Sequence, residues 1–328
     1  MHMIMNKVKN NLHRLRINSR NWLDVSSEQN LIPDKAFVKI YYQKTMGRKI
    51  DLREPKLLSE KLNWMKLYYH DPLFTVCSDK YRMREYVKLI LGEGYTPKLL
   101  GKWDRAEDID FNMLPNQFVI KTNHDGGPIV CLDKRLFDCE TARSKLKEKL
   151  NRDYYHRGRE WSYKNIKRCI FAEELLGDGK EDLVDYKFFC FWGEPKVLYT
   201  TSEHTDAKHG GIDYFDMGFR HLPVKHGIDY PQAQKIPQKP NSFEEMIEVA
   251  RRLSSYGEGI PFVRVDLYSV NGRIYVGEMT FYPTNGMIDY DPPEWNRITG
   301  DYLQLPRKNG WKYQKGRDNE WIKNVLTS

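Results

Sequence analysis

The stretch FVRVDLYSVNGRIYVGEMTFYP, residues 262–283, reads as two β-strands joined at Asn271-Gly272, a pair that favours a tight hairpin turn. Apolar and polar residues alternate along both strands, which commits the chain to a sheet with one face packed on a core. The length of the turn decides which side chains share the other face. A two-residue loop places Asp266 and Glu278 on opposite faces, whereas a three-residue loop with a left-handed Gly272 places them on the same face.

We expect the three-residue loop, because it gathers the polar residues of both strands. Arg264 then lies opposite Glu278, and both share one face with Asp266 and Thr280. Carboxylates hold Mg²⁺ well and an arginine holds a phosphoryl oxygen, so this face predicts a magnesium–phosphate platform. The alternative is a solvated strand face with a cross-strand ion pair.

A second polar feature follows an earlier apolar run. In QFVIKTNHDGGPIV, residues 117–130, a predicted strand ends at Lys121, and His124 and Gly126-Gly127 come directly after it. Glycine turns let backbone N–H groups approach phosphate oxygens, and a lysine adds a point charge. The stretch therefore fits an anion site, although an ordinary strand and turn, with Lys121 reaching to water, explains the same residues.

Two further predicted strands carry charge at one end or on one face. RCIFAEELLGDG is apolar until Glu173-Glu174, and DYKFFCFWGEPKVLY sets Asp185 and Lys187 on one face. The chain thus contains, in order, a lysine strand with a glycine turn, an acid-tipped strand, an Asp-x-Lys strand and the charged hairpin.

The rest of the chain divides into a helical first part and a strand-rich second part. Helical periodicity covers residues 33–92, with Ser59 and Ser78-Asp79 as expected helix N-caps. Residues 202–240, rich in Gly, Pro, His and Tyr, are expected to form a long loop. The other expected elements are helices at 138–150 and at 241–256, the second capped by Ser242, and strands at 117–122, 168–174, 185–192 and 196–201.

The net charge of +8, with a pI near 9.0, favours an anionic partner. The 53 basic and 45 acidic residues are interleaved and no zinc-finger spacing occurs, so we expect no nucleic-acid partner. The five cysteines form no CxxC pair, which predicts a reducing compartment and therefore a cytoplasmic protein. We expect no membrane span, because no apolar run approaches about 20 residues, and no secretory signal.

The first twenty residues carry bases around the helically spaced Ile4, Val8, Leu12 and Leu15. A basic amphipathic helix of this kind can lie on an anionic membrane, which would give the protein a peripheral contact with the inner membrane surface. The alternative is a short helix docked on the body, or a frayed terminus.

The order of these features resembles the ATP-grasp superfamily, and in particular its TupA-like branch, which is named for teichuronopeptide biosynthesis and associated with cell-surface polysaccharide clusters. The resemblance runs from about residue 33 to 308 and includes SEKLNWMKL, DKYRMREYV, FVIKTNHDGG, DYKFFCFWGEPK, YFDMGFR, the hairpin and LQLP. It implies an α+β ATP-grasp fold, in which two α+β subdomains clasp ATP, preceded by a mainly helical N-terminal region. The divisions expected on this basis are a basic segment at 1–32, the helical region at 33–110, a lid subdomain at 111–177 and a C-terminal subdomain with the metal-binding hairpin at 178–328.

The resemblance also implies roles for the residues noted above, with ATP and Mg²⁺ as cofactors. The residues implied to hold ATP are Lys121, His124, Gly126 and Gly127 at the phosphates, Glu173, Glu174 and Leu176 at the adenine and ribose, and Lys187, oriented by Asp185, at a phosphate. The residues implied for catalysis are Arg264, which would stabilise the transferring phosphoryl group, and Lys187. The implied magnesium ligands are Asp266, Glu278 and Thr280. ATP-grasp enzymes often have Glu-x-Asn where this chain has Glu278-Met279-Thr280, which leaves the number of magnesium ions open.

ATP-grasp enzymes use ATP to activate a carboxylate as an acylphosphate, which an amine then attacks. The resemblance therefore implies a carboxylate–amine ligase that joins an amino acid or peptide to a uronic acid of a surface glycan. One alternative is a glycosyltransferase of the same pathway, since DID at 108–110 and DYD at 289–291 match the Asp-x-Asp pattern of metal-dependent transferases. Another is a non-catalytic protein that binds a nucleotide or glycan. His204 and His209 lie in a predicted loop without a third metal ligand, so they do not indicate a metal site.

Overall fold

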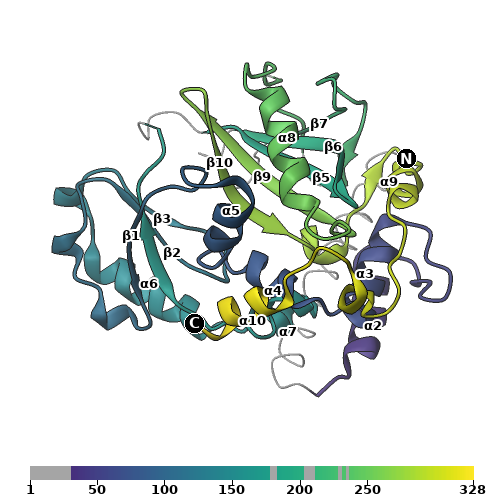
Figure 1. The fold of residues 1–328 in the computed structure, drawn as a ribbon, viewed down its shortest axis with the longest axis horizontal. Helices are drawn as coiled ribbons and strands as arrows, with labels where there is room; N and C mark the ends of the chain where they lie inside the picture. Colours follow the sequence, from purple (N-terminus) through teal and green to yellow (C-terminus); the bar gives the residue numbers. More distant parts are fainter. Residues whose placement is uncertain (1–30, 178–182, 203–210, 228–230, 234–235) are drawn as a thin grey trace, which may run out of the picture.

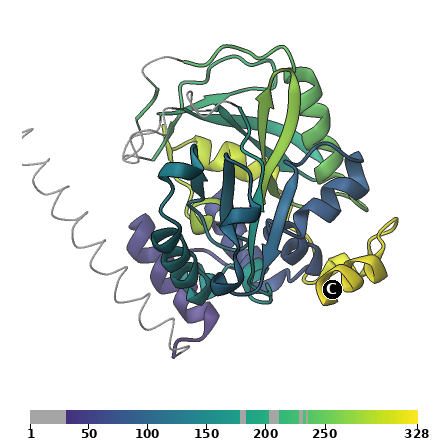
Figure 2. The same ribbon diagram turned by 90° about the vertical axis from the view of Figure 1, so that its left-hand side faces the viewer.

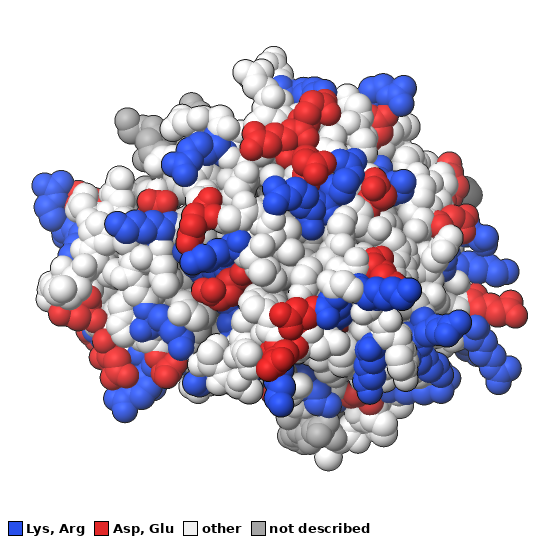
Figure 3. All heavy atoms as spheres, in the orientation of Figure 1, with Lys and Arg blue, Asp and Glu red and all other residues white. Residues whose placement is uncertain are grey.

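The structure is a computed structural model that describes residues 31–177, 183–202, 211–227, 231–233 and 236–328. The predicted N-terminal amphipathic helix, and the histidines at 204 and 209, lie outside these residues. Within them, no helix is long and apolar enough to cross a membrane. Acidic and basic side chains are intermingled over the face shown in Figure 3.

The first part of the described chain is helical, as predicted. The helices are α2 (Asp34–Met46), α3 (Leu58–Tyr68), α4 (Pro72–Ser78) and α5 (Met83–Leu91). Ser59 is not a cap, because it is buried inside α3, and the Glu60 carboxylate instead accepts hydrogen bonds from the N–H groups of Lys56 and Leu57. Asp79 does organise the turn that leads into α5.

Four strands and one helix form a small α+β unit, which we call the lid. The strands are β1 (Leu99–Trp103), β2 (Phe118–Thr122), β3 (Ile129–Cys131) and β4 (Ile170–Glu173), in the spatial order β1-β4-β2-β3. Helix α6 (Cys139–Asn151) packs on this sheet, and apolar side chains of both elements form a separate core. The sheet includes β1, which precedes residue 111, where the lid was expected to begin.

A larger antiparallel sheet forms the second unit, on the right of the lid in Figure 1. Its strands are β5 (Asp185–Phe191), β6 (Glu194–Ser202), β7 (Gly211–Phe215), β9 (Val263–Val270) and β10 (Arg273–Thr280), in the order β10-β9-β5-β6-β7. Helix α8 (Phe243–Ser254) covers one face, as Figure 2 also shows. Since the ring of Phe188 packs on that of Phe243, the charged residues that alternate with Phe188 point to the opposite face.

Shorter elements complete the fold. They are α7 (Tyr154–Gly158), α9 (Trp295–Tyr302), α10 (Asn319–Thr327) and a two-stranded sheet of β8 (Lys225–His226) and β11 (Tyr290–Asp291). The prediction of a loop over 202–240 is therefore wrong in part, because β7 and β8 lie within it. Strand β7 is buried at every residue, so tertiary packing stabilises it. The residues on both sides of it have a composition typical of loops, and for this reason the sequence did not predict the strand.

The turn of the hairpin differs from the predicted one. Val270 pairs with Arg273, so the loop has two residues, and both Asn271 and Gly272 have positive φ, 51° and 77°. This is the turn geometry that Asn-Gly favours in hairpins. The predicted three-residue loop, with Ser269 opposite Arg273, is wrong, whereas the left-handed Gly272 is confirmed.

A bulge nevertheless brings the carboxylates to one face. The register shifts by one residue at Gly277, after which Glu278 pairs with Asp266 and Thr280 pairs with Arg264. One extra residue switches the face of every side chain beyond it, so Glu278 and Thr280 join Asp266. The prediction that Asp266 and Glu278 share one face is confirmed, but the bulge places them there and the turn does not.

The C-terminal segment is fixed to the helical region by a buried ion pair. Both guanidinium ends of Arg317 donate to the carboxylate of Asp71, with 2.8 Å between Nη1 and Oδ2, and both side chains are 1% exposed. Asp71 also caps α4 by accepting from the N–H of Leu73. Losing one partner of such a pair leaves a buried charge without compensation.

We expect Arg317→Met to lower the free energy of unfolding by about 3–5 kcal/mol, because Asp71 is left buried and unpaired. Urea unfolding followed by circular dichroism measures this change. The matched control is Arg297→Met, which breaks an exposed pair with Asp301 and should cost about 1 kcal/mol or less. Equal effects of the two substitutions would contradict the assignment.

Candidate functional site

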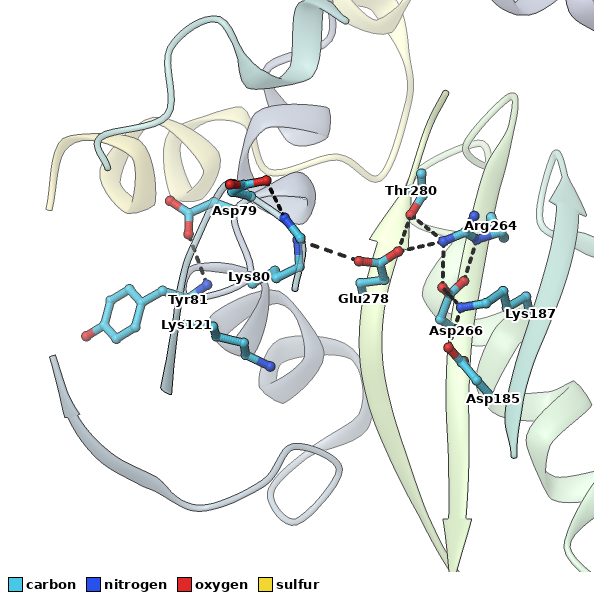
Figure 4. A network of polar contacts seen from close by, with 12 residues as sticks. Asp79, Lys80, Tyr81, Lys121, Asp185, Lys187, Arg264, Asp266, Glu278 and Thr280 are labelled. Carbon is cyan, nitrogen blue, oxygen red and sulfur yellow. Dashed lines mark hydrogen bonds and ion pairs between the residues drawn. The ribbon is translucent and has the colours of Figure 1, made fainter. Parts of the chain in front are cut away.

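Four polar side chains meet on the face of the hairpin that points away from α8. Arg264 donates from Nε and Nη2 to the two oxygens of Asp266, both at 2.6 Å. The same Nη2 lies 2.5 Å from Oε1 of Glu278 and 3.1 Å from Oγ1 of Thr280 (Figure 4). We call these four residues the hairpin cluster. One cationic nitrogen is therefore surrounded by oxygens from all three side chains predicted to bind magnesium.

Lys187 extends the cluster onto the neighbouring strand. It lies on β5 directly opposite Asp266, and its ammonium donates to Asp266 Oδ2 at 2.7 Å and to Asp185. Burial by itself would lower the pKa of Lys187, but Asp185 and Asp266 outweigh burial and raise that pKa. Lys187 is therefore a permanent cation that neutralises carboxylates in this structure.

Lys80 is a site residue that the sequence analysis did not single out. It lies between α4 and α5, where the Asp79 carboxylate accepts from the N–H groups of Tyr81 and Arg82. The N–H of Lys80 donates to the carbonyl of Asn123 in the lid, and its ammonium lies 3.6 Å from Glu278 Oε2. A lysine at the start of a helix looks like a solvated residue in the sequence, so only the fold reveals its position.

Glu278 is ionised in this setting. Burial would raise the pKa of its carboxyl, but the cations of Lys80, Arg264 and Lys187 outweigh burial and lower that pKa. The hairpin cluster thus combines anionic oxygens with the cation of Arg264 on β9, and Lys187 on β5 and Lys80 of the helical region add two further cations next to it.

Two pockets meet at Lys80. The lid-side pocket, of about 740 Å³ including space open to solvent, lies between the lid and β10. The hairpin-side pocket, of about 650 Å³ measured in the same way, lies beyond Glu278 and is more polar. Predicted residues that line the first are Lys121, Glu173, Glu174 and Leu176, and those that line the second are His124, Gly126, Arg264, Glu278 and Thr280. Gly127, Asp185, Lys187 and Asp266 line neither pocket.

Lys121 is already paired in the lid-side pocket. Its ammonium donates to Oε1 of Glu173 on the adjacent strand, while Arg84 of α5 lies 3.7 Å from Oε2 of the same carboxylate. Val119 and Leu176 add apolar surface to this pocket, and Tyr268 of β9 lines it from the hairpin. The sequence analysis missed Arg84 and Tyr268, which no local motif marks.

The loop after Lys121 is held by a lysine from α6. The ammonium of Lys149 donates to the carbonyl oxygens of Gly126, at 2.6 Å, and Gly127. Gly127 has a φ of 71°, which favours glycine. His124 is buried, and burial lowers its pKa to about 4, so it is neutral at pH 7 and brings no charge to an anion.

The acids of the two Asp-x-Asp triplets serve other contacts. Asp110 accepts from the N–H of Asn112, and Asp289 pairs with Arg48 at 3.2 Å. None of the four triplet acids lines either of the two pockets.

The oxygens of Asp266, Glu278 and Thr280 fit a hard cation such as Mg²⁺, because a single cationic nitrogen of Arg264 contacts all three. Among the described residues, no group of three or more His, Cys, Asp or Glu side chains is arranged to hold a metal. Two carboxylates and a hydroxyl are nevertheless a suitable set for Mg²⁺, which in nucleotide sites takes its remaining ligands from phosphates and water.

A lid and a larger antiparallel sheet that ends in a charged hairpin, with a lysine-lined cleft between lid and hairpin, define an ATP-grasp protein. The chain belongs to the TupA-like ATP-grasp family, whose model matches residues 60–304 of the 328. No curated protein gives a significant match.

Solved structures similar to the chain include ligases. The D-alanine–D-alanine ligase from Bacillus anthracis complexed with ATP is 13% identical, with a TM-score of 0.38 over 68% of this chain and 56% of that one. The L-amino acid ligase from Bacillus licheniformis is 16% identical, with a TM-score of 0.42 over 70% and 51%. The chain thus spans little more than half the length of each of these two proteins. The family match gives the glycosyltransferase alternative no support.

Proposed function

We propose that this protein is an ATP- and Mg²⁺-dependent carboxylate–amine ligase that forms an acylphosphate intermediate. The observation that carries the proposal is the junction of the two pockets at Lys80 and the hairpin cluster. Lys80 lines both a partly apolar pocket and a polar one, and it forms an ion pair with Glu278, which lines the polar one.

The lid-side pocket would take the adenine and ribose, with Leu176 and Val119 against the base. Lys121, which pairs with Glu173 in this structure, would turn toward the phosphates, where a charge-assisted hydrogen bond is stronger than a neutral one. Lys80 would meet the phosphates at the junction, since it lines both pockets.

Asp266, Glu278 and Thr280 would hold Mg²⁺, which when bound with ATP supplies charge neutralisation at the β and γ phosphates. Arg264 would stabilise the transferring phosphoryl group from the edge of the hairpin-side pocket. Lys187 would keep Asp185 and Asp266 in position through the hydrogen bonds it already donates. In this structure most of the N–H groups of Arg264 donate to protein oxygens. To act on the phosphoryl group, Arg264 would have to donate some of these N–H groups to phosphoryl oxygens as well.

For the biological setting, we propose that the carboxylate belongs to an acidic sugar of a cell-surface glycan and the amine to an amino acid or peptide. The TupA-like family membership supports this setting. The basic N-terminal segment would then bring a cytoplasmic enzyme to the inner membrane surface.

Thermal denaturation with a panel of nucleotides tests the proposal first. ATP with Mg²⁺ should raise the midpoint of unfolding, because a ligand bound by the native state alone stabilises it. Stabilisation by a UDP-sugar instead would favour the transferase. The protein is then incubated with ATP, Mg²⁺ and pools of uronic acids and amino acids, and the nucleotides are separated by chromatography. ADP formed only with both pools supports ligation, AMP contradicts the acylphosphate route, and ATP binding without turnover would indicate a non-catalytic protein.

We expect Lys121→Ala to weaken ATP binding by about tenfold to a hundredfold, since one charge-assisted hydrogen bond to phosphate is lost. Calorimetry with ATP and Mg²⁺ measures the change. Lys147→Ala is the matched control, because Lys147 is an exposed lid residue paired with Glu107 and lines neither pocket. An unchanged affinity in Lys121→Ala would show that Lys121 only holds Glu173.

A further inference from the structure

The hairpin-side pocket contains a buried carboxylate that the proposed nucleotide chemistry does not use. Glu160 lies between α7 and the short helical turn Trp161–Tyr163, is 4% exposed and lines the pocket. Within the described part of the chain, its carboxylate makes no hydrogen bond and no ion pair. A buried carboxylate without a partner is costly, so its presence calls for a ligand or a function.

Lys66, the cation with the largest influence on the pKa of Glu160, is directed elsewhere. The ammonium of Lys66 donates to the carbonyl oxygens of Gly158, at 2.9 Å, and Asn285, at 2.5 Å, and no ion pair joins Lys66 to Glu160 among the described residues. Burial is the largest influence on both groups, and it raises the pKa of Glu160 to about 7 and lowers that of Lys66 to about 8. The cations of Lys66, Arg264 and Lys80 favour the charged form of Glu160, but none of them forms an ion pair with its carboxylate among the described residues.

Aromatic rings surround the same space. Tyr154, Tyr163 and Tyr282 line the pocket with Glu160, and the hydroxyl of Tyr282 is buried without a hydrogen-bond partner. A carboxylate and tyrosine rings together favour an ammonium group, through charge pairing and cation–π attraction. A sugar hydroxyl would satisfy a hydrogen bond but would leave the charge of Glu160 uncompensated.

The hairpin-side pocket carries charges of both signs. Its cations are Lys80, which also lines the lid-side pocket, and Arg264, and its carboxylates are Glu160 and Glu278. A pocket with both charges suits a reaction in which a phosphorylated carboxylate and an amine meet. A cationic donor would be drawn to the carboxylate and not to the cations.

We propose that the hairpin-side pocket is the binding site of the amine donor and that Glu160 holds the amino group of that substrate. This assignment rests on the proposed ligase function and adds the position and chemical class of one substrate. Glu160 thereby determines specificity for a primary amine.

Isothermal calorimetry tests the assignment with the full chain, Mg²⁺ and a non-hydrolysable ATP analogue. The probes are the twenty common amino acids, glycylglycine and ethanolamine, each compared with its N-acetylated form. We expect one or more of the amines to bind and its acetylated form to fail. Glu160→Gln, which keeps the shape and removes the charge, should weaken amine binding at least tenfold while the affinity for the ATP analogue stays within about twofold. Glu148→Gln, an exposed position on α6, should change neither.

A readout with hydroxylamine separates the two halves of the reaction. Hydroxylamine at high concentration traps an acylphosphate as a hydroxamate without needing the amine site. Glu160→Gln should keep uronic-acid-dependent hydroxamate formation and lose transfer to the amine that binds.

The inference is overturned if no probe binds the unsubstituted protein, if the acetylated forms bind equally, or if Glu160→Gln binds the amine unchanged. Each of these results leaves the proposed function standing as long as the ATP analogue binds. Failure of the ATP analogue itself would instead refute the proposed function.

Discussion

An Asp266→Asn protein is expected to lose at least about 99% of its ATP turnover while keeping its fold. A neutral amide is a poorer ligand for Mg²⁺ than a carboxylate, and the metal contributes several kcal/mol to phosphoryl transfer. Asp266 is 1% exposed and accepts from both Arg264 and Lys187, so it is fixed in place before any ligand arrives. The measurement is ADP release at saturating ATP over a range of Mg²⁺ concentrations.

The Mg²⁺ dependence separates a metal ligand from a purely structural residue. If Asp266 binds the metal, the half-saturating Mg²⁺ concentration should rise as turnover falls. Asp216→Asn is the matched control, because Asp216 caps a turn next to β7 and contacts Arg220 away from the hairpin cluster. Full activity in Asp266→Asn would mean that Asp266 is not a metal ligand and that the site must be redrawn.

The second large effect is expected at Arg264, where Arg264→Lys should lower turnover by about a thousandfold. A single arginine placed on a transferring phosphoryl group contributes about 10³ or more in the phosphoryl-transfer enzymes where it is known. Lysine offers one ammonium in place of a planar fork, whereas Arg264 contacts Asp266, Glu278 and Thr280 at once. Single-turnover ADP formation measures the loss.

Nucleotide affinity distinguishes the two roles that Arg264 could have. If it acts on the phosphoryl group during transfer, the dissociation constant of ADP should change little while turnover falls. If it only positions the carboxylates, the half-saturating Mg²⁺ concentration should rise in parallel with the loss. Arg220→Lys, at an exposed turn, serves as the control. Retention of more than a tenth of the activity would exclude a role for Arg264 in phosphoryl transfer.

Local patterns predicted most of the framework. The helical region, the strands β2, β4 and β5, and helix α8 appear close to their expected bounds, because hydrophobic periodicity is a property of neighbouring residues. The prediction failed at β7, a short strand in loop-type sequence, and at Ser59, where burial in a core displaced a capping role.

In the hairpin, the sequence predicted correctly which side chains share a face but not the backbone feature that places them there. Alternation of residue types indicated that Asp266 and Glu278 belong together, yet the predicted turn was wrong. The bulge occurs at Gly277, where a Cβ would lie 2.6 Å from the ring of Tyr268. The glycine therefore lets the backbone of β10 come close to that ring, and no local sequence pattern predicts this contact.

The sequence by itself determined the family, the order of the charged strands and the residue types available for binding anions and cations. Those properties depend on near neighbours in the chain, which share one strand or one turn. Only the tertiary structure decided which charges meet. Lys80 reaches Glu278 across almost 200 positions, and Glu160 lines the same pocket as Arg264. Long-range packing sets these distances and the burial that shifts each pKa, and neither is encoded in any single stretch of the chain.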